Sequence, residues 1–316
     1  MPGYDTHYLF GVHTYRRMPD SAIKNNISRF QSPYKLGILG PDIFFYYATE
    51  VVAARKNIGS TMHTSKTDIF FKKCIEYAIS QEDEARIICI SYISGFLTHY
   101  TLDCLVHPYV YWMTDYNHKT KDYLEKHFSL ETDIDIMLLR TYLDTTPREF
   151  FSRSEVSLSS QEMNVICSLL HYAIRHTYHD SRITKRGIKM AILSLQKEHK
   201  LLKLFSSKAK NAIGTIEYAF VGQRYIAPLI PGGDEVKHLD PLNLSHHIWF
   251  NPWDLNISST ESVPQLLNRA RDRYLLTIFL LDNFLEDTSN NKAFALLLNK
   301  IGSKSYHSGL NCRIPS

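Results

Sequence analysis

The sequence predicts an all-α fold, and three observations support this prediction. Apolar residues recur at intervals of three and four along most of the chain, which is the period of an amphipathic helix. Strand signals are weak, because no convincing series of alternating residues is joined by Asn-Gly or Asp-Gly turns. Hydrophobic residues make up 44% of the 316 residues and charged residues 22%, which is typical of a globular protein with a substantial core.

The first half of the chain is predicted to contain four helices. The first begins near Asp5 or Thr6, which are good N-cap residues. A loop at Gly37–Asp42 leads to the aromatic stretch Ile43–Tyr47, which either packs in the core or forms an apolar rim. Pro108 is expected to end a long apolar helix, because proline disfavours helical backbone in the residue before it. The predicted helices cover about Asp5–Arg17, Lys66–Ser80, Glu82–Val106 and Lys119–Tyr142.

The second half is also predicted to be helical, apart from one long loop. This loop of about 30 residues, Pro228–Thr260, contains several Gly and Pro residues, and loops of such length are usually functional or cover the surface. Within it, His246-His247 either lines the mouth of a site or packs back onto the helices. The helices predicted in this half are Ser160–Tyr178, Thr184–Leu204, Lys208–Tyr225, Ser262–Leu285 and Asn291–Ile301.

Charge and cysteine usage limit the function classes. The formal net charge is only +4, with 36 Lys+Arg against 32 Asp+Glu, so a nucleic-acid partner is not expected. The N-terminus lacks the features of a secretory signal and no apolar stretch is long enough to cross a bilayer, which predicts a cytoplasmic protein. Five cysteines without a Cys-x-x-Cys spacing agree with a reducing compartment. The sequence does not indicate an oligomeric state.

Paired histidines and carboxylates carry the functional signal. His99 and Asp103 are four residues apart, so at about 100° per residue they project from the same face of a helix. His127 and Glu131 repeat this spacing on the next predicted helix. Imidazole and carboxylate ligands suit Zn²⁺, and a buried carboxylate is costly unless a cation compensates it. Each pair could otherwise be a hydrogen-bonded core pair without a metal. His107 continues the helix face of His99 and Asp103, and Asp135 continues that of His127 and Glu131.

With these residues, the N-terminal half resembles the zinc-dependent phospholipase C family. The family includes secreted bacterial enzymes that hydrolyse phosphatidylcholine and, more distantly, the single-strand-specific zinc nucleases. The resemblance covers roughly Thr6–Leu139, and its most specific part is the His-Tyr-x-x-Asp pattern at His99–Asp103. The other positions that resemble the family's metal ligands are His7, Asp42, His63, His107, His127 and Glu131.

The resemblance implies a multi-helix bundle of the phospholipase C and zinc nuclease type that holds two to three Zn²⁺ ions. A metal-bound water or hydroxide would attack the phosphorus of a phospholipid or related diester, and Asp42 would accept a proton or orient the water. A phospholipid substrate also implies peripheral contact with a membrane. The implied ligand sets are Asp42, His63, His99 and Asp103 for one ion, His107, His127 and Glu131 for a second, and His7 with a bridging Asp103 for a third.

The resemblance divides the chain into two parts and leaves other functions open. Residues 1–150 are expected to form the phospholipase C-like metal-binding domain, and residues 151–316 a helical C-terminal extension packed on it. The alternatives are a nuclease or phosphatase on the same metal core, and a non-catalytic module that binds zinc or lipid. His179-Asp180 is also the dipeptide of another class of helical metal phosphohydrolases, which needs further ligands that the sequence does not clearly provide.

Overall fold

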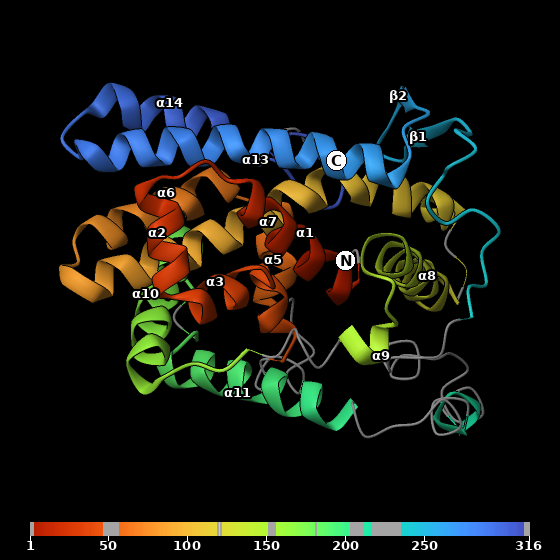
Figure 1. The fold of residues 1–316 in the computed structure, drawn as a ribbon, viewed down its shortest axis with the longest axis horizontal. Coiled ribbons are helices and arrows are strands. Elements are labelled where there is room, and N and C mark those ends of the chain that lie inside the picture. The colour runs from red at the N-terminus through yellow and green to blue at the C-terminus, as the bar shows by residue number, and fades with distance from the viewer. Residues whose placement is uncertain are drawn as a thin grey trace.

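In the computed structural model, the described residues are 3–46, 57–118, 120, 122–150, 156–180, 182–202, 212–216 and 235–312. They form the predicted all-α bundle, in which the only sheet among these residues has two strands (Figure 1). The helices of the first half are α1 (Tyr4–Arg17), α2 (Ala22–Arg29), α3 (Gln31–Gly37), η1 (Gly40–Tyr46), α5 (Ile58–Thr64), α6 (Thr67–Ile79), α7 (Asp83–Met113), η2 (Tyr116–His118), α8 (Tyr123–Leu143) and α9 (Pro147–Phe150). Those of the second half are α10 (Ser160–Tyr178), α11 (Lys185–Leu202), α13 (Val263–Glu286) and α14 (Asn291–Ile301).

The 31-residue helix α7 forms the centre of the bundle. Apolar residues occur on all its faces, which is the pattern of a helix surrounded by other elements. It packs against α1, α2, α3, α6, α10 and α13, and Figure 1 shows α13 and α14 lying along one side of it while α11 lies on the opposite side of the molecule. Polar side chains of α7 are therefore buried wherever they occur.

Helix α3 crosses α7 in backbone contact at two glycines. A side-chain carbon on Gly37 would lie 2.2 Å from the carbonyl oxygen of Tyr92, and one on Gly95 would lie 2.1 Å from a carbonyl oxygen of α3. No larger residue fits at either position without moving a helix. This close crossing brings the carbonyl group of Ile38, just after α3, next to the imidazole of His99.

The prediction that Pro108 ends the long helix is wrong, because α7 continues to Met113 with Pro108 inside it. A proline within a helix removes one hydrogen bond and costs about 3 kcal/mol. The hydrogen bond that is lost here is the one from a backbone N–H at position 108 to the carbonyl of Cys104. Gly309 packs its backbone against this carbonyl, since a side-chain carbon on Gly309 would lie only 2.2 Å from the oxygen. Burial of the last turns, including Val110, then favours continuation of the helix.

Local signals explain the boundaries that were predicted well. Helix α10 has the predicted bounds, and Ser159 and Glu162 form a capping box at its start. Ser262 and Gln265 form another at the start of α13. The helices α2, α3 and α5 were not predicted, because seven or eight residues hardly show a helical period. Most of the predicted helix Lys208–Tyr225 lies outside the described residues, of which 212–216 are helical.

The predicted loop Pro228–Thr260 contains a β-hairpin, so that expectation is corrected. Strands β1 (Trp249–Asn251) and β2 (Asp254–Ser259) pair antiparallel, with Trp249 opposite Ser259. Trp249 is buried and donates a hydrogen bond through Nε1 to the carbonyl of Glu261, which fixes the hairpin to the start of α13. The part of the loop before residue 235 lies outside the described residues.

Residues 302–312, here called the C-terminal segment, follow α14 and pack back against α6 and α7. Thr67 of α6 donates its hydroxyl hydrogen to the carbonyl of Lys304, and the N–H of Lys304 donates to the Tyr100 hydroxyl of α7 at 3.1 Å. A β-bridge between Lys304 and Asn311 closes the segment into a loop. Among the described helices, none is long and apolar enough to cross a membrane.

Candidate metal centre

The eight predicted site residues come from five elements and converge in the interior of the bundle. All of them are buried, and Asp42 is the most exposed at 5%. Because α7 contributes three of the eight, the central helix is the base of the site. The residues are His7 of α1, Asp42 of η1, His63 of α5, His99, Asp103 and His107 of α7, and His127 and Glu131 of α8.

The ligand atoms of these residues form three groups. Within each group, the nitrogen and oxygen atoms all lie within 4.8 Å of one another. The first and second groups share one imidazole, whereas the third is separate. The first group contains His7, His99 and Asp103, the second contains Asp42, His63 and His99, and the third contains His107, His127 and Glu131.

The carboxylate of Asp103 lies at the centre of this arrangement. Its oxygens are 3.1 Å from Nε2 of His7, 3.0 Å from Nε2 of His99 and 3.9 Å from Nε2 of His63. Nδ1 of His107, one turn further along α7, is 3.7 Å away. Burial alone would raise the pKa of Asp103, but the imidazoles of His107, His99 and His7 hold it well below its ordinary value. Asp103 is therefore suited to remain ionised while fully buried.

Backbone carbonyls orient the imidazoles of the second group. Nδ1 of His63 donates to the carbonyl of Gly59 at 2.7 Å, and Nδ1 of His99 donates to the carbonyl of Ile38 at 3.0 Å. A carbonyl can only accept, so Nδ1 carries the proton and Nε2 of the neutral ring keeps its lone pair for a ligand. Gly40, at φ +51°, allows the chain to pass the ring of His99, because a side-chain carbon there would lie 2.4 Å from it.

Several ligand atoms are buried without a hydrogen-bond partner among the described residues, although they lie close together. Buried polar atoms are normally hydrogen-bonded, and unpaired buried charges are costly. A cation that coordinates these atoms removes the cost, and a mixture of imidazole nitrogens and carboxylate oxygens suits zinc. The residues therefore fit zinc. The atoms are Nε2 of His7, His99 and His107, both oxygens of Asp103 and Oδ1 of Asp42.

A family profile described as zinc dependent phospholipase C matches residues 6–205, which is more than half of the chain. The protein belongs to this family. No curated protein and no solved structure shows a significant match. The matched region contains all eight site residues and ends before the hairpin, α13, α14 and the C-terminal segment.

The third group of this phospholipase C-family protein is buried, and its burial shifts the pKa of all three residues. Burial holds the pKa of His107 and of His127 well below the ordinary histidine value, and it raises the pKa of Glu131 well above the ordinary carboxyl value. Both imidazoles are therefore neutral, which is the form that binds a metal. A cation among these three residues would stabilise the ionised carboxylate and reverse the shift of Glu131.

In the first group, the pKa values of His7 and His99 shift in opposite directions. Burial lowers the pKa of His7, and the neighbouring His99 lowers it further. Burial also acts to lower the pKa of His99, but the carboxylates of Asp103 and Asp42 outweigh it and raise the pKa. The two carboxylates therefore stabilise a positive charge on His99.

The C-terminal segment lies outside the matched region, yet it contacts two groups. Tyr306 donates its N–H to the carbonyl of His63 at 2.8 Å, and its own carbonyl accepts from Nδ1 of His107 at 2.8 Å. The ring of His307 lies next to the rings of both histidines. Sequence reasoning missed these contacts, because two of them use backbone atoms and His307 has no helical spacing to any other candidate.

Asp135 lies outside the three groups and has a structural role. Its carboxylate accepts hydrogen bonds from the backbone N–H groups of Asp5 at 3.3 Å and Thr6 at 2.8 Å, and from the Thr6 hydroxyl. These donors belong to the first turn of α1, where N–H groups have no partner within the helix. Asp135 thus fixes the start of α1 to α8 and helps to position His7.

The remaining sequence candidates lie around the site or away from it. Phe44 is buried in the core, whereas Phe45 is 42% exposed and its ring stacks 5.7 Å from that of His63. Trp253 of the hairpin contacts Tyr111, whose ring lies 4.9 Å from that of His127. The alternative dipeptide His179-Asp180 follows α10, where Asp180 pairs with Arg182 outside the three groups. His246 donates a hydrogen bond through Nδ1 to the carbonyl of Thr260, just after the hairpin.

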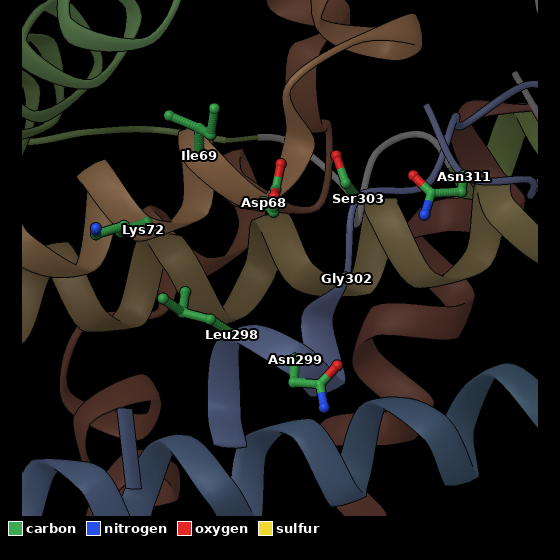
Figure 2. Close-up of a pocket in the computed structure, with 8 residues that line it drawn as sticks. All are labelled: Asp68, Ile69, Lys72, Leu298, Asn299, Gly302, Ser303 and Asn311. Carbon is green, nitrogen blue, oxygen red and sulfur yellow. The ribbon is translucent and has the colours of Figure 1, made fainter. Parts of the chain in front are cut away.

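A separate cleft of about 320 Å³ lies between α6, α14 and the C-terminal segment (Figure 2). None of its lining residues belongs to the three groups, so it is distinct from the candidate metal centre. The C-terminal segment thus contributes to this cleft as well as to the centre. The lining residues are Asp68, Ile69, Lys72, Leu298, Asn299, Gly302, Ser303 and Asn311.

Proposed function

We propose that this protein hydrolyses a phosphodiester in the manner of a phospholipase C and cleaves the glycerol-side phosphate ester of a phospholipid or related diester. The observation that carries the proposal is the convergence of three buried His and carboxylate groups around Asp103, with unpartnered ligand atoms. Membership of the zinc dependent phospholipase C family supports the reaction class. Two to three zinc ions, when bound, would polarise the phosphate and lower the pKa of a bound water.

We assign all eight residues as metal ligands. His99 stands between the first and second groups, while Asp103 is within 4 Å of imidazole nitrogens from all three. Their role is to hold positive charge at fixed positions beside the phosphate, so that negative charge growing on its oxygens is stabilised. The third group, on α7 and α8, would hold charge on the side facing Tyr111.

We assign Asp42 as the residue that orients the attacking water or accepts its proton. Its oxygens lie 3.3 Å from Nε2 of His63 and 3.5 Å from Nε2 of His99, and Oδ1 has no hydrogen-bond partner in the described part of the chain. Asp42 is also the most exposed of the eight residues. A carboxylate oxygen without a hydrogen-bond partner beside the proposed metal ligands is placed to accept a hydrogen bond, or a proton, from a water molecule.

The proposed substrate implies where the protein acts. Contact with a phospholipid implies peripheral contact with a membrane surface, and the exposed ring of Phe45 beside His63 would suit an acyl chain.

The division into residues 1–150 and residues 151–316 stays a prediction. Core side chains from both parts, such as Phe96 and Tyr274, belong to one hydrophobic cluster.

The test compares wild type with Asp103→Asn in the full chain. Zinc content, and hydrolysis of short-chain phosphatidylcholine, of a chromogenic phosphodiester and of single-stranded DNA, would be measured. Wild type should bind zinc and prefer the phospholipid, whereas Asp103→Asn should lose at least about 100-fold in zinc affinity or activity, since even outer-shell partners contribute 10–100-fold. Asp133→Asn is the matched control, because Asp133 is equally buried and bonds to backbone N–H groups of Lys237 and His238.

The alternatives predict different results in the same assays. Faster cleavage of single-stranded DNA than of phospholipid would favour a nuclease, against the weak net charge of +4. Zinc binding without any hydrolysis would favour a non-catalytic module. Wild-type protein that binds no zinc would contradict the whole proposal.

A further inference from the structure

The C-terminal segment brings one additional histidine to the candidate metal centre. The ring of His307 lies 5.4 Å from that of His63 in the second group and 6.1 Å from that of His107 in the third group. It also lies 5.4 Å from the ring of Tyr111. His307 is therefore adjacent to both groups that would flank a phosphate.

Hydrogen bonds fix the backbone at His307 and at the two residues before it. Tyr306 is hydrogen-bonded through its N–H to His63 and through its carbonyl to His107, so the preceding residue joins the second and third groups. The N–H of His307 donates to Oγ of Ser305 at 3.2 Å, and Ser305 Oγ itself lies 3.3 Å from the carbonyl of His63. The position of His307 relative to the centre is thus determined by the same bonds that orient the ligands.

His307 differs from the eight proposed ligands in two respects. It belongs to none of the three groups found among the described residues, so its ring nitrogens do not converge with two other ligand atoms. It is also partly exposed, whereas every one of the eight is buried. His307 thus lies beside the second and third groups and is more exposed than their members. This position suits contact with a bound substrate better than coordination of a metal.

We propose that His307 is a substrate-binding residue that donates a hydrogen bond from its ring to a phosphate oxygen of the diester. This inference rests on the proposed function, since it requires a phosphodiester at the centre. A neutral imidazole has one N–H donor, and phosphate oxygens are strong acceptors at about 2.7–2.9 Å. The second and third groups contact the phosphate from within the bundle, and His307 contacts it from the C-terminal segment.

The experiment uses the zinc-loaded full chain and its variants His307→Ala and His307→Gln. Zinc content, binding of inorganic phosphate by calorimetry, and kcat and KM on short-chain phosphatidylcholine are measured. His307→Ala should keep its zinc, bind phosphate about tenfold more weakly and show a larger change in KM than in kcat. His307→Gln should recover part of the affinity, because its amide can also donate. His118→Ala, at a side chain that is 82% exposed, is the control of the same type and should match wild type.

Other outcomes would overturn the inference. Loss of zinc in His307→Ala would make His307 a ligand or a structural residue, and unchanged phosphate affinity would leave it only a packing role. Wild type that binds phosphate but hydrolyses no diester would contradict the proposed function, while the phosphate measurements would still decide the role of His307. Wild type that binds zinc but no phosphate would contradict both.

Discussion

At the scale of single residues, Asp135 shows how burial changes a carboxyl group. Burial raises its pKa to about 7, although the N–H groups of Thr6 and Asp5 and the Thr6 hydroxyl partly oppose the shift. Its ordinary pKa is 3.8, so the folded state binds the proton more tightly than the unfolded state. The stability that this group contributes is therefore present at low pH and is lost as the pH rises through about 7.

Asp135→Asn is expected to reduce this pH dependence in the metal-free protein. At pH 5 both side chains are largely neutral, whereas at pH 8 only wild type must keep a buried charge. The free energy of unfolding of the variant, relative to wild type, should therefore rise between pH 5 and pH 8 in urea titrations. Asp20→Asn, at an exposed carboxylate, should show no such change. A constant difference between Asp135→Asn and wild type would contradict the prediction.

The sequence predicts some of these residues better than others for a physical reason. His99 and Asp103 are recognisable because the helix places residues four apart on one face. The distance between His7 and Asp103 depends on how α1 packs against α7 and is not visible in a spacing. Orientation of a ring by a backbone carbonyl, as for His107 and Tyr306, leaves no trace in residue types.

At the scale of elements, the contact between α7 and the C-terminal segment links the folding of two distant parts of the chain. Gly309, at φ +64°, packs against the carbonyl of Cys104 that Pro108 leaves without a helical partner. Three residues before Gly309, the carbonyl of Tyr306 accepts from His107 on the same stretch of α7. A shift of the segment would therefore move the bond that orients a proposed ligand.

Gly309→Ala should lower both stability and zinc affinity. A methyl group there meets the Cys104 carbonyl, and the cost is about 1–3 kcal/mol in the free energy of unfolding. Gly302→Ala is the matched control, because Gly302 also has a positive φ, +68°, but its nearest neighbour would be 3.8 Å away. Both variants should unfold at lower urea, but only Gly309→Ala should weaken zinc binding in a competition assay. Equal zinc affinities would show that the segment does not support the third group.

Elements differ in how well the sequence predicts them. Long helices with capping residues, such as α10, are recognised because their local signals agree with their packing. The short helices α3 and α5, which carry or precede site residues, form mainly through contacts with α7 and η1. Pro108 misled the prediction because burial of the turns that follow it, including Val110, favours continuation of the helix.

At the scale of the whole molecule, the fold and the metal contribute separately to stability. The core extends well beyond the candidate centre, from Ile23 and Ile27 in α2 to Ile188 and Ile192 in α11. Such a core should hold the helices together without a metal. The ligand atoms without a hydrogen-bond partner, in contrast, gain stability when a cation is bound.

Removal of zinc should therefore lower the unfolding temperature without abolishing the fold. Chelation is expected to reduce Tm by roughly 5–10 °C, from a site occupied at about 100 times its Kd. Helical circular dichroism at 25 °C should persist. Added Zn²⁺ should restore Tm and Mg²⁺ should not, because imidazole ligands disfavour magnesium. Complete loss of helical signal on chelation would show instead that the metal is required for folding.

The bonds of Tyr306 to His63 and His107 have a consequence for biosynthesis. All eight proposed ligands are translated before residue 132, yet the carbonyl that orients His107 and the N–H that binds His63 belong to a residue made about 170 positions later. A nascent chain that has already exposed its ligands therefore cannot form the complete centre until residue 306 has left the ribosome. We therefore expect the proposed hydrolase activity to appear only after the C-terminal segment has been made.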